Sequence, residues 1–407
     1  MKPLQGIKVI ELGTHVAVPM ATRLLADWGA DVIKIEGIQG DLWRWYGLNV
    51  GVPVSEEENP YFAVPNANKR IVSLDLKQPE GLELLHRLLS EADAFVTNVR
   101  MKGLARLGLD YDTLSQRYPG LVYFHFTGYG ETGPWASRPG FDIAAFWGAG
   151  GMINNWPMEG DGPFAPSSAF GDSTVSSMAA SGILAALLGR ERSGEGCFLS
   201  TSLYATALWY NFGDLVACQP QYGCRRPYRR GINANPFLAP YPCGDGNWIY
   251  LAALEYERCY ARCLRALGLE QYLDDERYNT LRAYLQHNRE FASIIAQTLL
   301  TRPADEWVQR FEAEDIVIQR LYRSSELWQS EQAWAAGMFH AVDYPESGNR
   351  TVFPNTPVVF GDAVPAVTEA VGGIGCDTEA VLTDLGCTEE EIRALRERGV
   401  VRMPKKA

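Results

Sequence analysis

The 407-residue chain lacks most of the features that mark specialised protein classes. It has no apolar run long enough to span a bilayer, because the longest small-apolar stretch, Met178–Gly189, is short and rich in Ser and Gly. The N-terminus lacks the basic and then apolar segments of a signal peptide. Its 37 basic residues are outnumbered by 49 acidic ones, for a net charge of −12, whereas proteins that follow nucleic-acid phosphates normally carry the opposite balance. We therefore expect neither a nucleic acid nor a membrane as partner.

Cysteine and histidine are also sparse. None of the eight cysteines forms a Cys-x-x-Cys pair, and none lies at zinc-finger spacing from any of the five histidines. We therefore expect no metal site. Free thiols without a signal peptide indicate the reducing cytoplasm.

Apolar strands alternate with helices in the first part of the chain. The predicted strands are Gly6–Leu12, Asp31–Glu36, Ile71–Leu76, Ala94–Asn98 and Leu121–Thr127, with helices at Pro19–Trp28 and Pro79–Glu91. Such alternation is typical of βαβ units, so we expect an α/β fold with a Rossmann-like, doubly wound parallel sheet. The segment after the first strand has one glycine, Gly13, where a dinucleotide-binding fingerprint needs three. A nicotinamide-dependent dehydrogenase is therefore disfavoured.

A shift in composition predicts a second domain. Gln219–Pro236 is rich in Pro, Gly and Arg, and a second irregular stretch lies near Leu321–Glu331. We expect a smaller α+β domain at 219–331, linkers included, and a large domain made of 1–218 and 332–407. Within the smaller domain the sequence predicts a strand at Trp248–Ala253 and helices at Glu255–Leu267, Asn279–Leu300 and Pro303–Ala313.

The most unusual local sequence is Ala169-Phe170-Gly171-Asp172-Ser173, followed by a run of small residues. Asp172 stands at the predicted start of a helix, where backbone N–H groups lack partners and could serve a carboxylate or an oxyanion. The same position suits a purely structural N-cap. The residues alone leave both roles open.

Two further segments could bind a ligand. Gly128–Pro134, with Pro139–Asp142 behind it, is a Gly/Pro-rich loop after a strand, where α/β proteins often place binding groups. A long turn would have the same composition. The second is a basic set in an acidic chain, and it could hold an anionic, phosphate-bearing ligand or be ordinary solvated surface. It consists of Lys69, Arg70, Arg100, Lys102 and Arg106.

In this order, several segments resemble the class III CoA-transferase (CaiB/BaiF) family. They are ELGTHVAVPMATRLLADWGADVIKIE, NANKRIVSLDLKQPEG, TNVRMKGLARLGLDY, GYGETGPWASRPGFD, AFGDS and RSGEGCFLSTSLY. The resemblance implies that Asp172 attacks an acyl-CoA thioester, giving a mixed anhydride and then an enzyme-bound CoA thioester. A carboxylate nucleophile exchanges acyl groups by dividing one hard step into easier ones. The family also implies an interlocked homodimer, acyl-CoA and a small carboxylic acid as substrates, and no tightly bound cofactor.

The resemblance also implies a set of CoA-site and acyl-site residues. These are Lys69, Asn98, Val99, Arg100, Arg106 and Leu107 around CoA, Phe141 beside Asp142 near the pantetheine or acyl group, and Val16 and Ala17 at the acyl end. Some members carry a glutamine donor where this chain has Ala17. The segment Asn233–Tyr241 stands where formyl-CoA transferases have a poly-glycine loop, and it resembles instead the branch acting on 2-hydroxy acids and aryl-propionates. We expect an apolar acyl pocket to which Val18, Phe146 and Trp147 also contribute, and hence a 2-hydroxy, branched or aryl-propionate-type acid.

Two alternatives stay open. Isomerases like α-methylacyl-CoA racemase use a histidine in a Gly-His-Asp motif, whereas this chain has Gly140-Phe141-Asp142, and a phenyl ring cannot act as a general base. The second alternative is a non-catalytic CoA-binding protein, in which Asp172 would have no catalytic role.

Overall fold

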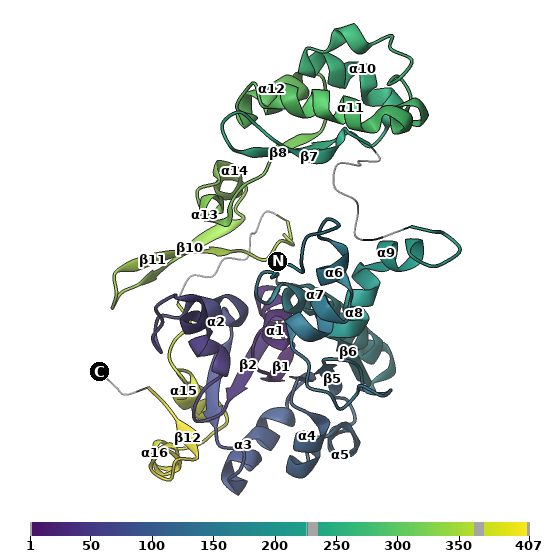
Figure 1. Cartoon of the computed structure of the whole chain (residues 1–407). Coiled ribbons are helices and arrows are strands. Elements are labelled where there is room, and N and C mark those ends of the chain that lie inside the picture. Colours follow the sequence, from purple (N-terminus) through teal and green to yellow (C-terminus); the bar gives the residue numbers. More distant parts are fainter. Residues whose placement is uncertain (1, 225, 227–234, 362–369, 405–407) are drawn as a thin grey trace. The chain divides into compact units, whose positions relative to one another are not determined.

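The computed structural model describes residues 2–224, 226, 235–361 and 370–404. The chain divides into two compact units, shown in Figure 1. Unit 1 comprises Met1–Ile153, Phe164–Cys224 and Glu331–Ala407, and unit 2 comprises Asn154–Pro163 and Arg225–Ser330. Composition led us to expect a small domain at 219–331, whereas unit 2 consists of Arg225–Ser330 together with Asn154–Pro163. Much of the expected first linker, including residues 225 and 227–234, lies outside the described residues.

A seven-stranded sheet forms the centre of unit 1. Its strands are β1 (Lys8–Leu12), β2 (Asp31–Glu36), β3 (Arg70–Leu74), β4 (Ala94–Thr97), β5 (Val122–Thr127), β6 (Phe198–Ser202) and β12 (Val401–Arg402). They lie in the order β12-β3-β2-β1-β4-β5-β6, and all neighbours are parallel except β12, which is antiparallel to β3. The expected α/β fold with a largely parallel sheet is confirmed, and the predicted strand ends differ by two residues at most.

Helices cover both faces of this sheet (Figure 1). The helices that begin in unit 1 are α1 (Ala17–Asp27), η1 (Leu42–Val50), α2 (Pro60–Asn66), α3 (Pro79–Leu89), α4 (Met101–Leu107), α5 (Tyr111–Arg117), the π-helix η2 (Asp142–Gly148), α6 (Met152–Asn155), α7 (Phe170–Ser193), α8 (Leu203–Tyr210), α9 (Phe212–Ala217), α14 (Glu331–Ala335), α15 (Thr378–Asp384) and α16 (Glu389–Glu397). Alternate strand residues point to opposite faces. Val9 of β1 therefore packs with α1 and α7, and Ile10 packs with α3, α4, α5, α15 and α16.

The chain beyond unit 2 returns to unit 1. The hairpin of β10 (Phe339–Tyr344) and β11 (Asn349–Pro354) is tied to α1, because Arg23 donates a hydrogen bond to the Pro354 carbonyl at 3.1 Å. The C-terminal helices then lead to β12, where Val401 pairs with Leu74.

Unit 2 has a core of its own. A three-stranded antiparallel sheet, β7 (Leu238–Pro242), β8 (Trp248–Ala252) and β9 (Ile318–Arg320), accompanies α10 (Tyr256–Leu267), η3 (Glu270–Tyr272), α11 (Leu281–Leu299), α12 (Ala304–Ala313) and α13 (Ser324–Leu327). Its buried residues are rich in aromatics, with Tyr278 stacked on Phe291 at a centroid distance of 4.3 Å. Within the described residues, no helix is long and apolar enough to cross a membrane.

Candidate active site

A cavity of about 620 Å³ lies where β1, β4 and β5 end in unit 1. The strand order reverses between β1 and β4, because the chain first builds β2 and β3 on one side of β1 and then β4–β6 on the other. Open α/β sheets bind ligands at the carboxyl ends of the strands, at such a switch point. The lining residues are Thr14, His15, Ala17, Asn98, Arg100, Met101, Lys102, His125, Phe126, Thr127, Gly128, Glu131, Ala136, Ser137, Arg138, Pro139, Gly140, Phe141, Asp172 and Leu203.

Asp172 is the carboxylate in the first turn of α7, and it lines this cavity. The turn is entered through Ala169, whose φ of 59° is unusual for a residue with a β-carbon. The side chain is largely withdrawn from solvent, and this burial, together with the nearby charge of Asp142, raises the pKa of Asp172 to about 7. A carboxyl group with a raised pKa in a cavity is a candidate for chemistry.

Asp142 supports Asp172 from the first residue of η2. It is buried, and its Oδ1 accepts a hydrogen bond from the backbone N–H of Asp172 at 3.0 Å. Burial raises the pKa of Asp142 to about 6, although hydrogen bonds from Asp172, Trp147 and Gly171 act in the opposite direction. Asp142 therefore fixes the position of the α7 N-terminus from beneath the cavity surface.

Glycines permit the close packing at this site. A β-carbon on Gly171 would lie 2.1 Å from Asp142 Oδ1 and 2.5 Å from Phe146, so no larger residue fits immediately before Asp172. Gly128 and Gly140 touch backbone to backbone, since a β-carbon on either would lie 2.8 Å from the other's Cα. The Gly-Asp pair and the Gly/Pro-rich loop noted in the sequence are thus requirements of this packing.

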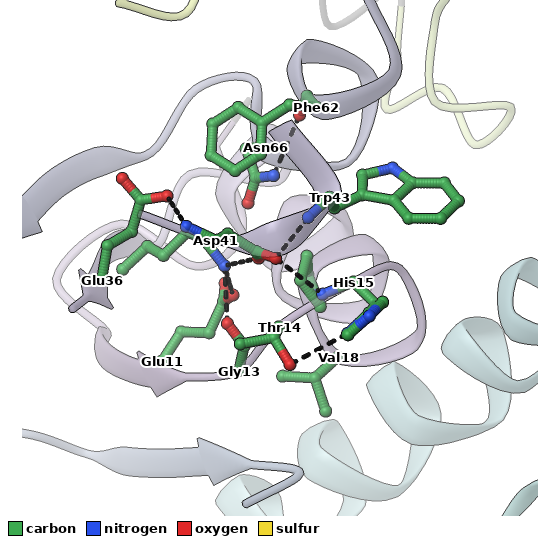
Figure 2. Close-up of polar contacts among 12 residues, drawn as sticks. Glu11, Gly13, Thr14, His15, Val18, Glu36, Asp41, Trp43, Phe62 and Asn66 are labelled. Carbon is green, nitrogen blue, oxygen red and sulfur yellow. Dashed lines mark hydrogen bonds and ion pairs between the residues drawn. The ribbon is translucent and has the colours of Figure 1, made fainter. Parts of the chain in front are cut away.

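The β1–α1 loop, Gly13–Val16, is held by hydrogen bonds on several sides (Figure 2). Lys34 Nζ donates to the Gly13 carbonyl at 2.7 Å, and Asp41 Oδ1 accepts from the backbone N–H of His15 at 3.1 Å. Asn98, at the end of β4, bonds both the N–H and the carbonyl of Thr14, at 3.1 and 2.8 Å. These contacts fix the loop that forms one wall of the cavity.

A buried ionic network lies under this loop. Its three acidic groups are Glu11, Glu36 and Asp41, and its three basic groups are Lys34, Arg44 and Lys69. Glu11 stands opposite Lys34 in the β1–β2 register and accepts from it at 2.8 Å and from Lys69 at 2.7 Å. Burial raises the pKa of Glu11, but the two lysines outweigh it and lower that pKa to about 2.

Three cations, Arg100, Lys102 and Arg138, stand on the cavity wall. All three are exposed, and none of them takes part in a salt bridge within the described part of the chain. Arg138 packs over the Trp135 ring at 4.7 Å, which keeps its guanidinium beside the Gly/Pro-rich loop. Exposed arginine and lysine groups without an acidic partner can bind the phosphates of an anionic ligand.

His125 connects two walls of the cavity. Its Nδ1 lies 2.5 Å from Glu131 Oε1 and its Nε2 lies 2.9 Å from the Val99 carbonyl oxygen. The ring thereby ties the end of β4 to the Gly/Pro-rich loop that carries Arg138.

Comparison with known proteins identifies the family of this chain. Residues 4–378 match the model of CoA-transferase family III. The chain belongs to CoA-transferase family III.

Two known CoA-transferases are similar in sequence to this chain over nearly its whole length. An (R)-2-hydroxy-4-methylpentanoate CoA-transferase of Clostridioides difficile is 38% identical over 400 residues, covering 98% of this chain and 99% of that protein. A cinnamoyl-CoA:phenyllactate CoA-transferase of Clostridium sporogenes is 37% identical over 393 residues, covering 96% and 95%. A CAIB/BAIF family protein from Brucella suis has a similar structure, with a TM-score of 0.81 at 27% identity over 94% of this chain and 99% of that one.

The structure brings part of the expected site together. Of the nucleophile, CoA-site and acyl-site residues that the resemblance implied, those lining the cavity are Ala17, Asn98, Arg100, Phe141 and Asp172. Phe141 is 66% exposed and Ala17 is buried at the start of α1. The expected acyl-pocket residues Val16, Val18, Phe146 and Trp147 pack instead in the core beneath the cavity surface.

The other expected CoA-site residues lie outside the cavity lining. Lys69 is fully buried, and its ammonium donates to Glu11, the Pro19 carbonyl and Asn66. Its three N–H groups are therefore used inside the protein, and we do not retain Lys69 as a phosphate ligand. Val99 meets His125 through its carbonyl, and Leu107 packs against the core. Arg106 is exposed on α4, the helix that also carries Lys102.

Three of the lining residues that were not predicted for the site carry a basic or imidazole side chain that could bind substrate. Lys102 belongs to the basic set but was not assigned to CoA, and Arg138 lies between Gly128–Pro134 and Pro139–Asp142, the two parts of the Gly/Pro-rich segment that the sequence singled out. His15 follows β1 directly, and its position after the first strand of a Rossmann-like sheet is the signal that could have found it.

Proposed function

We propose that this transferase moves CoA from an acyl-CoA to a free carboxylic acid through covalent intermediates on Asp172. The observation that carries the proposal is the partly buried Asp172 carboxylate, at the switch point of the sheet, in a cavity whose wall also bears three cations.

The proposed reaction has two halves. The ionised Asp172 attacks the thioester carbonyl carbon, CoA leaves as thiolate, and an acyl-aspartyl anhydride remains. The thiolate then attacks the aspartyl carbonyl, which releases the first acid and leaves an enzyme-CoA thioester. The acceptor carboxylate repeats these steps in reverse order, so CoA ends on the acceptor and Asp172 is restored.

The CoA site is proposed along the wall that bears Arg100, Lys102 and Arg138, with Asn98 beside it. Exposed cations around a cavity favour an anionic ligand, and charge-assisted bonds to phosphate are stronger than neutral ones. Arg106, one turn along α4 from Lys102, remains a proposed contact of the outer phosphates.

The acceptor is proposed to be a 2-hydroxy, branched or aryl-propionate-type acid. Ala17, Phe126, Phe141 and Leu203 give the cavity apolar surface, which stabilises a bound hydrocarbon group by about 25 cal/mol per Å² of area buried. The names of the two relatives at 37–38% identity mention a branched 2-hydroxy acid and phenyllactate. Small, strongly hydrated acids would lose hydration there without compensation.

Exposed apolar side chains on α8 and α9 support the proposed homodimer. Trp209 and Phe212 are 69% and 68% exposed, and Tyr210, Leu215 and Val216 are also exposed beside them. Soluble monomers rarely expose large apolar patches, so we propose that a second copy covers these side chains. All eight cysteines are free thiols, which favours the proposed cytoplasmic location.

The decisive experiment incubates the enzyme with an acyl-CoA and a labelled free acid, with Asp172→Asn as the comparison. We expect label in the CoA pool with the wild type only, and hydroxylamine during turnover should convert Asp172 to its hydroxamate. Transfer by Asp172→Asn at more than a few per cent of the wild-type rate would refute the mechanism. Exchange of the α-proton with solvent deuterium, without acyl transfer, would instead support the racemase-like alternative.

A further inference from the structure

The imidazole of His15 lines the same cavity as Asp172, yet no step above uses it. The ring lies edge-on to Phe141, with a centroid distance of 5.5 Å. Phe141 directly precedes Asp142, whose carboxylate holds the backbone N–H of Asp172. Phe141 therefore contacts His15, the next residue holds the Asp172 backbone, and His15 and Asp172 line the same cavity.

The backbone of His15 is held in an unfavourable conformation. Its φ of 65° lies in the left-handed region, which few residues with a β-carbon adopt, although histidine does so more often than most. Such strain persists only where the surroundings enforce it, and it is concentrated at functional sites. Here the surroundings are the hydrogen bonds of the β1–α1 loop, including the one from the His15 N–H to Asp41. The ionic network beneath thus fixes the position of this imidazole.

One ring nitrogen of His15 is available for a substrate. Nδ1 lies 3.1 Å from the Thr14 hydroxyl, and among the contacts of the described residues Nε2 has no partner. When the Thr14 hydroxyl donates to Nδ1, the ring hydrogen is on Nε2, which makes Nε2 a donor. Ala17, which begins α1 two residues later, offers the cavity no side-chain donor.

We propose that His15 donates a hydrogen bond from Nε2 to the acyl carbonyl oxygen while Asp172 attacks. This inference rests on the proposed function. An Asp172 oxygen forms a bond to the carbonyl carbon, and the π electrons move onto the carbonyl oxygen, where the His15 hydrogen bond stabilises the negative charge. The carbonyl then re-forms and the C–S bond breaks, so that the electron pair leaves with CoA as thiolate. The imidazole keeps its proton throughout.

Three variants of full-length enzyme test this role. His15→Phe keeps an aromatic ring without nitrogens, and His15→Gly accepts the left-handed backbone while removing the ring. Both should lower kcat about 100-fold or more, as loss of one oxyanion donor typically does, with the KM for acyl-CoA changed much less. His15→Asn tolerates the same backbone and retains an N–H donor, so its kcat should exceed that of His15→Gly. The loss of kcat should be equal for a 2-hydroxy acid and for its unsubstituted analogue, because the proposed hydrogen bond is to the acyl carbonyl oxygen, which both substrates have.

Two results would overturn the inference. One is a kcat of His15→Gly within threefold of wild type. The other is a loss confined to the 2-hydroxy acid, which would make His15 a ligand of the hydroxyl group. Failure of the proposed function is recognised separately, because hydroxylamine trapping of Asp172 in the wild-type enzyme does not depend on any His15 variant.

Discussion

Replacing Asp172 with Asn should stabilise the protein at alkaline pH while abolishing transfer. The pKa of this carboxyl is about 7 in the folded chain against an ordinary value of 3.8, because burial and Asp142 disfavour its charge. The folded state therefore binds more protons than the unfolded state between these values, and stability falls as pH rises from about 4 to 7. At 1.36 kcal/mol per pH unit, the loss between pH 5 and pH 8 is about 2–3 kcal/mol.

The assay is thermal unfolding of the wild type and Asp172→Asn at pH 5 and pH 8, at one protein concentration. The variant should exceed the wild type by several degrees at pH 8, since 1 kcal/mol corresponds to roughly 2–4 °C for a domain of this size, and by much less at pH 5. Glu191→Gln, an exposed carboxylate on the same helix, is the matched control and should show no such difference. The reasoning is refuted if the Asp172→Asn advantage is the same at both pH values.

Three further predictions follow from the site. The kcat/KM for acyl-CoA should rise with pH to a plateau above about 7, because only ionised Asp172 attacks; a profile flat from pH 5 to 8 would contradict its raised pKa. Arg138→Gln should raise the KM for acyl-CoA about tenfold with little change in kcat. The comparison is Lys69→Met, which should lower the melting temperature instead, because it removes one of the two buried cations that pair with Glu11. Gly171→Ala should reduce kcat at least 100-fold, since its β-carbon would displace Asp142 and with it Asp172; crystals or circular dichroism can verify that the fold is retained.

The sheet could be predicted because its strands carry strong local signals. Asp31–Glu36 was predicted with its observed ends, and the flanking helices follow the spacing of buried apolar residues. The charged residues inside these strands carried no such signal. Glu11 and Lys34 meet only because β1 and β2 pair in parallel register, and that pairing is a property of the assembled sheet.

Predictions for the site depended on whether a residue's role is local or set by packing. Asp172 follows Gly171 at a helix start, and the structure explains that pair by the space which Asp142 and Phe146 occupy. Lys69 is a basic residue just before a strand, and many surface lysines stand in the same position. The local sequence therefore cannot show that Lys69 is buried and forms an ion pair with Glu11.

His15 shows how a buried charge network can act on a site without lining it. Three basic groups, Lys34, Lys69 and Arg44, lie among three carboxylates beneath the β1–α1 loop, and one of these carboxylates, Asp41, also accepts a hydrogen bond from the His15 backbone. A buried ion pair is weak evidence for stability, because desolvation offsets most of the attraction, but it can specify one conformation. In this enzyme the conformation specified is the left-handed turn that brings an imidazole beside Phe141, next to the Asp142 that holds the Asp172 backbone. The network therefore shapes the cavity wall as Asp142 does, by holding a backbone N–H, although neither the network nor Asp142 lines the cavity.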